Sequence, residues 1–354
     1  MYSLDCLNIY LVWQCNLHCR HCWVSADNAE NQNSERIDVS LIMEGIKEAV
    51  SLGLKIIKIS GGEPFLYPDD MCKIIELANS FNLDINIESN GTIFQEKVIS
   101  LLDPGKTYLN VSLDGYESNI HNEMRGNQDA FQKTIRGIEL LQRKDLPFGV
   151  TYTIHDGNVK NIDSMIDFLR NMSVAELKLN PIMAIGRARK GEQKFPFLLT
   201  LENLIEVYEK YNNYRRNSVH VSIMVSPCFI KPHQIITGQK QICACNYLNM
   251  LSILPDGRIG LCGEAKDIKE FCFGNIHEES IKAIWKNSKN LKRMRKETEN
   301  IEGVCGECNY NKVCRGGCRI AAYLYGTKLN SPNPVADTYF EKHGCLPFKS
   351  IKGK

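Results

Sequence analysis

The sequence has little net charge and no long apolar run. Its 43 basic and 41 acidic residues leave a formal net charge of +2, which is no excess of the kind that attracts nucleic acid or an anionic membrane. No stretch reads as a transmembrane helix, and residues 1–5 (MYSLD) lack the basic start of a signal peptide. We therefore expect a cytoplasmic protein with neither a nucleic acid nor a membrane as partner.

Cysteine, in contrast, is abundant, with 15 residues in a chain of 354. Disulfides are rare in the reducing cytosol, and most of these cysteines cluster at the short spacings of metal ligands. Cys6, Cys72 and Cys272 stand apart from the clusters and are expected to be small apolar core residues. The cysteine pattern therefore predicts metal binding or catalysis.

Strand and helix patterns alternate in the first half of the chain, which is typical of βαβ units with a parallel sheet. Right-handed crossovers curl such a series into a barrel or part of one. The predicted fold is α/β, a partial (β/α)6 TIM-like barrel followed by a small cysteine-rich iron–sulfur domain. The predicted strands cover 7–13, 54–59, 83–88, 108–113, 148–154 and 176–180, and helical spacing occurs near 39–52, 70–81, 94–102, 129–143 and 160–171.

The composition of the sequence changes near Cys228, where cysteines become frequent and the strand patterns become short. We expect a barrel domain over 1–196, a helical connector over 197–227 and a cysteine-rich domain over 228–354.

Distinctive motifs lie just past the predicted strand ends. In a parallel barrel these ends form one face, which carries the active site, so we expect the motifs to meet there. They are Cys15–Cys22 (CNLHCRHC), 60–64 (SGGEP), 89–92 (SNGT), 112–115 (SLDG) and 181–187.

The first motif spaces Cys15, Cys19 and Cys22 as Cys-x3-Cys-x2-Cys. A [4Fe–4S] cluster normally takes four cysteines, so three local thiolates leave one iron open to an outside ligand. The alternative is a zinc loop completed by His18 or His21.

With these motifs, residues 7–190 resemble the radical S-adenosylmethionine (SAM) family. The resemblance implies that Cys15, Cys19 and Cys22 hold a cluster whose open iron takes the methionyl amine and carboxylate of SAM. It further implies reductive cleavage of SAM to a 5′-deoxyadenosyl radical, which abstracts hydrogen from a substrate. The electron would come from an external donor of the flavodoxin or ferredoxin type.

The glycine-rich motif fits this picture. Gly61 and Gly62 let backbone approach a ligand closely, and Glu63 offers a carboxylate to an ammonium group. They match the family motif that contacts the methionyl amine, although a plain turn is the alternative for such a sequence. His21 occupies the position whose backbone faces adenine in the family.

Five further residues are implied to bind the cofactor. Asn90, Ser112 and Asp114 offer short polar groups to the ribose hydroxyls and the cofactor carboxylate, with strand-end caps as the alternative. Asn180 and Arg187 match the last strand of the family, where a cation near the methionyl carboxylate is common; a solvated Arg187 is the alternative.

The C-terminal cysteines resemble the SPASM extension of radical SAM enzymes, whose core is the Cys-x2-Cys-x5-Cys-x3-Cys run at 305–318. The resemblance implies one or two auxiliary [4Fe–4S] clusters, with structural zinc sites as the alternative. The first cluster would use Cys245, Cys262 and Cys318, with Cys243 or Cys228 as a fourth ligand. The second would use Cys305, Cys308, Cys314 and a last cysteine near the C-terminus.

Two departures from the SPASM pattern stand out. Ala336 occupies the region where the last cysteine is expected, and Cys345 follows nine residues later, so either Cys345 replaces it or the second cluster is incomplete. Gly263 follows Cys262, where sulfatase-maturing members have an aspartate base, which argues against sulfatase maturation.

SPASM enzymes mostly modify peptides, so the resemblance implies a ribosomally made precursor peptide as substrate and crosslinking, decarboxylation or backbone excision as outcome. Tyr152 and His155 are candidate groups on the substrate side. The first strand begins by about residue 7, without a preceding leader-binding domain, so a separate leader-binding protein or the barrel itself would recognise the leader. The alternatives are tetrapyrrole side-chain modification, a non-catalytic iron–sulfur electron carrier and a zinc-dependent binding module.

Overall fold

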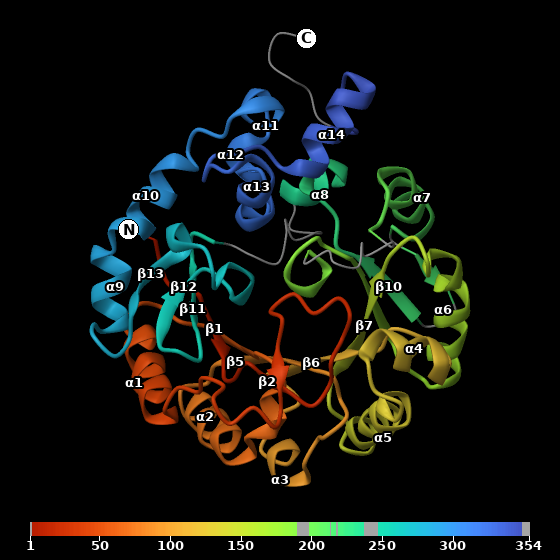
Figure 1. Ribbon diagram of the computed structural model, residues 1–354, viewed down its shortest axis with the longest axis vertical. Coiled ribbons are helices and arrows are strands. Elements are labelled where there is room, and N and C mark those ends of the chain that lie inside the picture. The colour runs from red at the N-terminus through yellow and green to blue at the C-terminus, as the bar shows by residue number, and fades with distance from the viewer. Residues whose placement is uncertain (1, 190–197, 213, 217–218, 237–246, 349–354) are drawn as a thin grey trace.

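The computed structural model describes residues 2–189, 198–212, 214–216, 219–236 and 247–348. Within them a twisted sheet forms a partial barrel with helices on its outer side (Figure 1). Eight neighbouring strands run parallel. In spatial order these are β11 (Met250–Ile253), β1 (Cys6–Tyr10), β4 (Ile56–Ser60), β5 (Asp84–Ser89), β6 (Thr107–Ser112), β7 (Phe148–Ile154), β8 (Glu176–Pro181) and β10 (Val219–Ile223).

Antiparallel strands complete both edges of the sheet. Beyond β11 lie β12 (Arg258–Gly260) and β13 (Cys272–Asn275), and beyond β10 lies the short β9 (Arg215–Arg216). Strands of the expected cysteine-rich domain, 228–354, therefore extend the barrel sheet on the far side of β1.

Helices cover the outer face of the barrel and build the C-terminal region (Figure 1). In the barrel they are α1 (Val39–Val50), α2 (Pro68–Ser80), α3 (Glu96–Ile99), α4 (Ser118–Arg125), α5 (Ala130–Arg143), α6 (Ile162–Asn171) and α7 (Leu201–Tyr211). The later helices are α8 (Pro232–Ile236), α9 (Ile281–Asn287), α10 (Lys289–Glu297), α11 (Gly303–Glu307), α12 (Asn311–Cys314), α13 (Arg319–Gly326) and α14 (Pro334–His343).

Helix α1 shows why these segments fold locally. The Asp38 side chain caps its N-terminus by accepting a hydrogen bond from the Ser40 N–H at 2.8 Å, which satisfies a backbone donor that has no partner within the helix. Ile42, Ile46 and Ala49 recur at helical spacing and are fully buried. The capped apolar stripe fixes both the start of the helix and the face that packs on the sheet.

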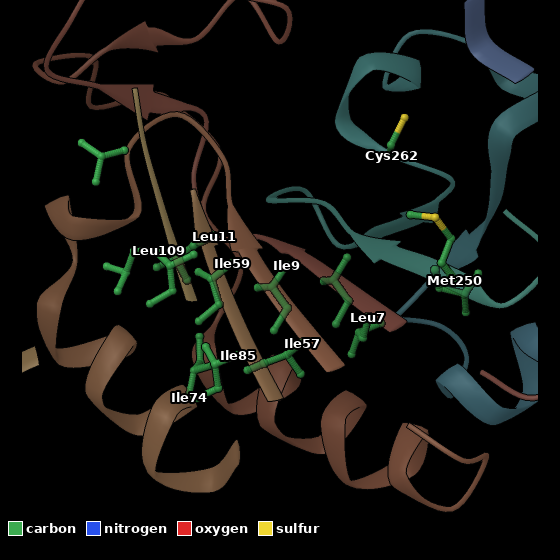
Figure 2. Close-up of a cluster of buried hydrophobic side chains, with 14 of the residues drawn as sticks. Leu7, Ile9, Leu11, Ile57, Ile59, Ile74, Ile85, Leu109, Met250 and Cys262 are labelled. Carbon is green, nitrogen blue, oxygen red and sulfur yellow. The ribbon is translucent and has the colours of Figure 1, made fainter. Parts of the chain in front are cut away.

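The core lies between the strands and this helical layer. Leu7 and Ile9 of β1, and Ile57 and Ile59 of β4, point to the helical side (Figure 2). They belong to one core cluster that includes Ile74 of α2, which lies beside Ile85. Full burial of such a side chain stabilises the fold by about 1.5–3 kcal/mol. The alternate residues of the same strands face the barrel interior.

The six predicted strands and their parallel arrangement are confirmed. The first ends at Tyr10 rather than at residue 13, because the chain then turns into the pair β2 (Gln14–Cys15) and β3 (Asp27–Asn28). The expected helical connector, 197–227, contains α7 but also β10, which pairs with β8. Sequence reasoning missed β10 because its apolar alternation spans only five residues, 219–223, and α4 because most of its residues are polar.

Candidate active site

The three cysteines of the N-terminal motif lie on the loop that follows β1. Cys15 and Cys19 are buried and Cys22 is half-buried. The Leu17 N–H donates to Cys15 Sγ at 3.4 Å, and the Ala26 N–H donates to Cys22 Sγ at 3.3 Å. Such N–H···S contacts stabilise thiolate ligands, so the loop suits a bound cluster.

Arg187 fastens this loop to the last part of the barrel. Its Nε donates to the Cys19 carbonyl and its Nη1 to the Ala26 carbonyl, both at 2.8 Å. Gly186 has a φ of +58°, and a Cβ there would lie 2.2 Å from the Cys22 carbonyl oxygen. The structure thus gives Arg187 a position in which it braces the cysteine loop, while its buried Nη2 has no hydrogen-bond partner within the described residues.

Gly61 and Gly62 lie against the backbone that leads into the cysteine loop. The Gly62 N–H donates to the Val12 carbonyl at 2.7 Å. A Cβ on Gly61 would lie 2.5 Å from that carbonyl oxygen, and one on Gly62 only 1.9 Å from the Gln14 carbonyl oxygen. Glycine is required here because two backbone segments touch.

Glu63 is fully buried at the end of β4. Its Oε1 accepts from the Ser89 hydroxyl at 2.9 Å and from the Phe65 N–H at 3.2 Å, and its Oε2 accepts from the Asn90 N–H at 2.9 Å. Burial raises the pKa of Glu63 to about 7, although these hydrogen bonds favour the charged form. A nearby ammonium group would complete the stabilisation of its carboxylate.

Asn90 connects this carboxylate to the cysteine loop. Its Nδ2 donates to the Asn16 side-chain oxygen at 2.9 Å and lies 3.7 Å from Cys15 Sγ. Its side-chain oxygen accepts from the Thr92 N–H at 2.9 Å, and its carbonyl accepts from the Thr134 hydroxyl at 2.9 Å. Its amide is thus held at the cysteine motif.

Asp114, just after β6, lies in a buried cluster of charged and imidazole groups. Its Oδ2 is 2.8 Å from Arg125 Nη2 and 3.5 Å from His21 Nε2, and its Oδ1 accepts from the Thr153 N–H at 2.9 Å. The Asp114 N–H donates to His121 Nδ1 at 3.0 Å. Burial opposes ionisation, but the Arg125 guanidinium holds the pKa of Asp114 below its usual value.

Arg125, which sequence reasoning missed, links this cluster to the cysteines. Its guanidinium is buried, and Nη1 lies 3.6 Å from Cys19 Sγ. Asp114 and Cys19 raise its pKa against the effect of burial. The available signal was the spacing of His121 and Arg125, four residues apart on α4 and hence on one helix face.

The histidines of this cluster are held neutral. Burial lowers the pKa of His21 to about 4 and that of His121 to about 3. His21 Nδ1, His121 Nε2 and Arg125 Nε are buried and have no hydrogen-bond partner within the described residues. Buried polar atoms of this kind call for a partner, and a polar cofactor beside the cysteine loop would provide one.

The remaining expected cofactor residues stand on the same strand ends. Ser112 ends β6 and pairs in register with Thr151, and Asn180 of β8 pairs with Thr153. Both are half-buried. They flank the Asp114 cluster, so the barrel brings together all the strand-end residues that the sequence singled out.

The barrel interior is polar and charged. Lys58 of β4 pairs with Glu88 of β5 at 2.7 Å, and the Ser60 hydroxyl lies 3.5 Å from the same carboxylate. Lys58 and Lys178 lower the pKa of Glu88 although burial opposes this. Lys178 stands on β8 between Thr151 and Ser222 of the adjacent strands, and it forms no ion pair within the described residues.

A second interior contact joins β6 to β8 across β7. The Tyr108 hydroxyl donates to the Glu176 carboxylate. It passes over Gly149, where a Cβ would lie 2.4 Å from the Tyr108 oxygen. Ordinary (β/α)8 barrels fill this space with branched apolar side chains, so the interior of this barrel is suited to a polar ligand.

The two expected substrate-side groups take different positions. Tyr152 is fully buried in the hydrophobic core on the helical side of β7. Its hydroxyl donates to the Asn158 carbonyl at 3.3 Å. His155 is buried just past the strand end and accepts from the Gly157 N–H at Nδ1, 3.1 Å away. Tyr152 is thus a core residue.

The C-terminal cysteines form two groups. Burial raises the pKa of Cys262, and the neighbouring Glu264 carboxylate and Cys318 thiol act in the same direction. The expected partners Cys243 and Cys245 lie outside the described residues. Figure 2 shows Cys262 on the β11–β12 side of the sheet, beyond Met250.

The second group surrounds a small pocket lined by Cys305, Cys308 and Cys314. The same pocket is lined by Cys228 and by Ala336. Cys345 is exposed and does not line it. The structure therefore brings together three of the four expected ligands of the second cluster, and adds a thiol from a distant part of the chain.

Two further findings bear on the alternatives. Within the described ranges, no group of three His, Cys, Asp or Glu side chains is arranged around a single-ion position. No helix of the described chain is long and apolar enough to cross a membrane.

Comparisons with known proteins agree with this geometry. The family model "Radical SAM superfamily" matches residues 11–171, and the SPASM model, "Iron-sulfur cluster-binding domain", matches residues 243–309. An AdoMet-dependent heme synthase from Methanosarcina barkeri is 25% identical over 87% of this chain and 89% of its own length.

Two solved structures share the fold. Native anSMEcpe with bound AdoMet and Cp18Cys peptide has a TM-score of 0.73 at 19% identity, covering 96% of each chain. Streptococcus suis SuiB bound to precursor peptide SuiA has a TM-score of 0.72 at 16% identity, covering 94% of this chain and 76% of SuiB. The chain therefore carries a radical SAM domain and a C-terminal SPASM domain, and these domains imply an enzyme with SAM and [4Fe–4S] clusters as its cofactors.

Proposed function

We propose that this enzyme modifies a peptide that enters the polar interior of the barrel. The observation that carries the proposal is the set of charged and polar side chains on the inner faces of the strands, above all Lys58, Glu88 and Lys178. Burying these groups against an apolar ligand would be costly, because each would lose solvent without gaining a partner. A peptide offers backbone amides and polar side chains as partners.

The charges also indicate which kind of peptide group would fit. Glu88 is already flanked by Lys58 and Lys178, so this trio carries a net positive charge. Lys178 has no carboxylate partner of its own within the described residues. A substrate carboxylate beside Lys178 would give its ammonium group an ion-pair partner, and we expect an acidic residue near the modified position.

The strand-end residues would prepare the cofactor. Cys15, Cys19 and Cys22 would hold the [4Fe–4S] cluster, whose chemistry with SAM is the reductive generation of a carbon-centred radical. Glu63, held by three hydrogen bonds, would accept the methionyl ammonium, and Asn90 and Ser112 would orient polar groups of SAM.

The cluster around Asp114 has a different task in this proposal. Asp114 fixes Arg125 beside Cys19, and Arg187 fixes the loop that carries the same cysteine. These residues would hold the cysteine loop in place and exclude water, rather than contact ribose. His21 and Asn180 would line the adenosine side.

The two structural neighbours were both determined with peptides, Cp18Cys and SuiA, which supports a peptide as the class of substrate. An external electron donor of the flavodoxin or ferredoxin type, and a separate leader-binding protein, complete the proposal as partners.

A second candidate is the modification of tetrapyrrole side chains. The observation that favours it is the curated relative named AdoMet-dependent heme synthase, which matches along 87% of this chain. Propionate groups would suit Lys58 and Lys178, but the flat apolar macrocycle would meet the ion pairs of the interior.

The test is an anaerobic reaction of the reconstituted enzyme with dithionite and SAM. It is offered either the peptides encoded by short reading frames beside its gene or a porphyrin with propionate side chains, and mass spectrometry follows both substrates. A mass change in a peptide supports the proposal, whereas a change in the porphyrin alone supports the second candidate and overturns it.

Lys178→Met gives a sharper version of the test. We expect this variant to lose peptide modification while it still forms 5′-deoxyadenosine from SAM. The matched control is Lys55→Met, because Lys55 is an exposed lysine just before β4 that pairs with Asp5. Equal loss in both variants would contradict a role of the interior in substrate binding.

A further inference from the structure

We propose that Cys228 supplies the fourth thiolate of the second auxiliary cluster, in place of the ligand that Ala336 cannot provide. The proposal concerns the metal site of the SPASM domain and is independent of the substrate. It replaces Cys345 as the expected ligand, and it removes Cys228 from the candidates for the first cluster.

The first observation is the composition of one pocket. Cys228 lines it together with Cys305, Cys308 and Cys314, although these follow it by 77 or more positions in the sequence. A [4Fe–4S] cluster is normally held by four cysteine thiolates. The other residues of the lining are Ser226, Pro227, Gly316, Asn333, Ala336 and Leu346, none of which carries a thiol, imidazole or carboxylate.

The second observation is that the structure holds Cys228 in this place. The Ser226 hydroxyl donates to the Asn333 side-chain oxygen at 2.9 Å, and the Cys228 thiol lies 3.3 Å from the Ser226 oxygen. The same Asn333 oxygen caps α14 by accepting from the backbone N–H of Ala336 at 3.3 Å. One side chain thus positions Cys228 and Ala336 relative to each other.

Packing strengthens this placement. The Phe229 ring contacts Tyr339 of α14 in a perpendicular arrangement, with ring centroids 5.7 Å apart. A Cβ on Gly317, in the loop that follows Cys314, would lie 3.0 Å from the Pro227 ring. The turn Pro227–Phe229 is therefore fixed against both α14 and the cysteine loop.

The pocket is also prepared for thiolates. The Asn333 N–H donates to Cys305 Sγ at 3.4 Å, and the Tyr310 N–H donates to Cys308 Sγ at 3.5 Å. Cys228, Cys305 and Cys308 are buried, with 4–6% of each residue exposed.

Cys345 and Ala336 are the competing positions. Ala336 is buried in the pocket lining but offers only a methyl group. Cys345 follows the end of α14, is exposed and does not line the pocket. Four thiolates would leave the second cluster without an open iron, so this cluster would transfer electrons rather than bind substrate at a metal.

The test compares four variants of the full chain after anaerobic reconstitution: Cys228→Ala, Cys345→Ala, Cys72→Ala, and Cys228→Ala combined with Ala336→Cys. Cys72 is a half-buried cysteine on α2 and serves as the matched control. The readouts are iron and sulfide content and the electron paramagnetic resonance spectrum after mild oxidation, and neither depends on activity.

We expect about 12 irons per chain, from three clusters of four, in the wild type and in the Cys345 and Cys72 variants. Cys228→Ala should lose one to four irons and give the spectrum of a three-iron cluster. Adding Ala336→Cys should restore the count and remove this spectrum, which distinguishes a lost ligand from a misfolded domain. The proposal is wrong if Cys228→Ala keeps the wild-type iron content, if Cys345→Ala loses iron instead, or if Ala336→Cys does not restore it.

Discussion

The substitution Asp114→Asn tests the buried charge cluster beside the cysteine loop. Asp114 Oδ2 lies 2.8 Å from Arg125 Nη2, and the two side chains are 0% and 8% exposed. Asparagine keeps the shape of the side chain and an oxygen that accepts from the Thr153 N–H, now 2.9 Å away. The change therefore removes the charge and little else, and it leaves the Arg125 guanidinium buried without its carboxylate.

Breaking a buried ion pair in this way costs about 3–5 kcal/mol of the free energy of unfolding. The matched control is Asp69→Asn, which breaks the pair of Asp69 with Lys97. That pair has a similar separation, 2.6 Å, but its side chains are 84% and 52% exposed. An exposed pair contributes at most about 1 kcal/mol, so the two variants should differ clearly.

The assay is urea unfolding of the reconstituted enzyme under anaerobic conditions, with the shift in the midpoint measured at unchanged slope. The double variant with Arg125→Met removes both charges, and its cost should be well below the sum of the two single costs. The reasoning is refuted if Asp114→Asn costs no more than Asp69→Asn, or if the costs of the two single variants simply add.

Three further predictions concern the residues around the cysteine loop. The pKa of Glu63 is about 7 in the folded chain against an ordinary 4.5, so folding favours its protonated form. Its contribution to the free energy of unfolding is therefore complete below pH 4.5 and is lost as the pH rises through 7. The loss amounts to about 3 kcal/mol, and urea titrations of Glu63→Gln should lack this dependence on pH. Gly62→Ala would place a Cβ 1.9 Å from a backbone oxygen, and the iron content of this variant should fall by about four. The control is Gly105→Ala, where the nearest contact is a side-chain oxygen at 3.3 Å, and it should retain its iron. Arg187→Met removes two hydrogen bonds to loop carbonyls and should also lower the iron content, while the exposed Arg189→Met should not; equal iron in these two variants would contradict the bracing role.

Local sequence was sufficient where neighbours in the chain decide the structure. Alternation such as Ile57 and Ile59 predicted the barrel strands, because a strand with a buried outer face must repeat every second residue. The spacing of Cys15, Cys19 and Cys22 identified the cysteine loop, since all three thiols come from one short segment. The special sequences after the strands were expected on one face, and the parallel sheet places them there.

The sequence was incomplete where a residue's partner lies far away in the chain. Gly61 and Gly62 were predicted to let backbone approach a ligand closely, and the structure adds that they accommodate the backbone of residues 12–14. Arg187 was predicted to bind the cofactor, and the structure adds that two of its nitrogens hold loop carbonyls. Tyr152 was a candidate substrate group, but it lies in the core.

By itself, then, the sequence determined the parallel α/β barrel, the cysteine motifs and the class of cofactor. Each of these depends on residues that are close together in the sequence or that repeat at a fixed period. Only the tertiary structure revealed Arg125 beside Cys19, the charged barrel interior, and Cys228 in the pocket of Cys305 and Cys308. These pairings join segments whose separation in the chain follows no period. These pairings depend on how the whole chain packs, and no local sequence pattern predicts them.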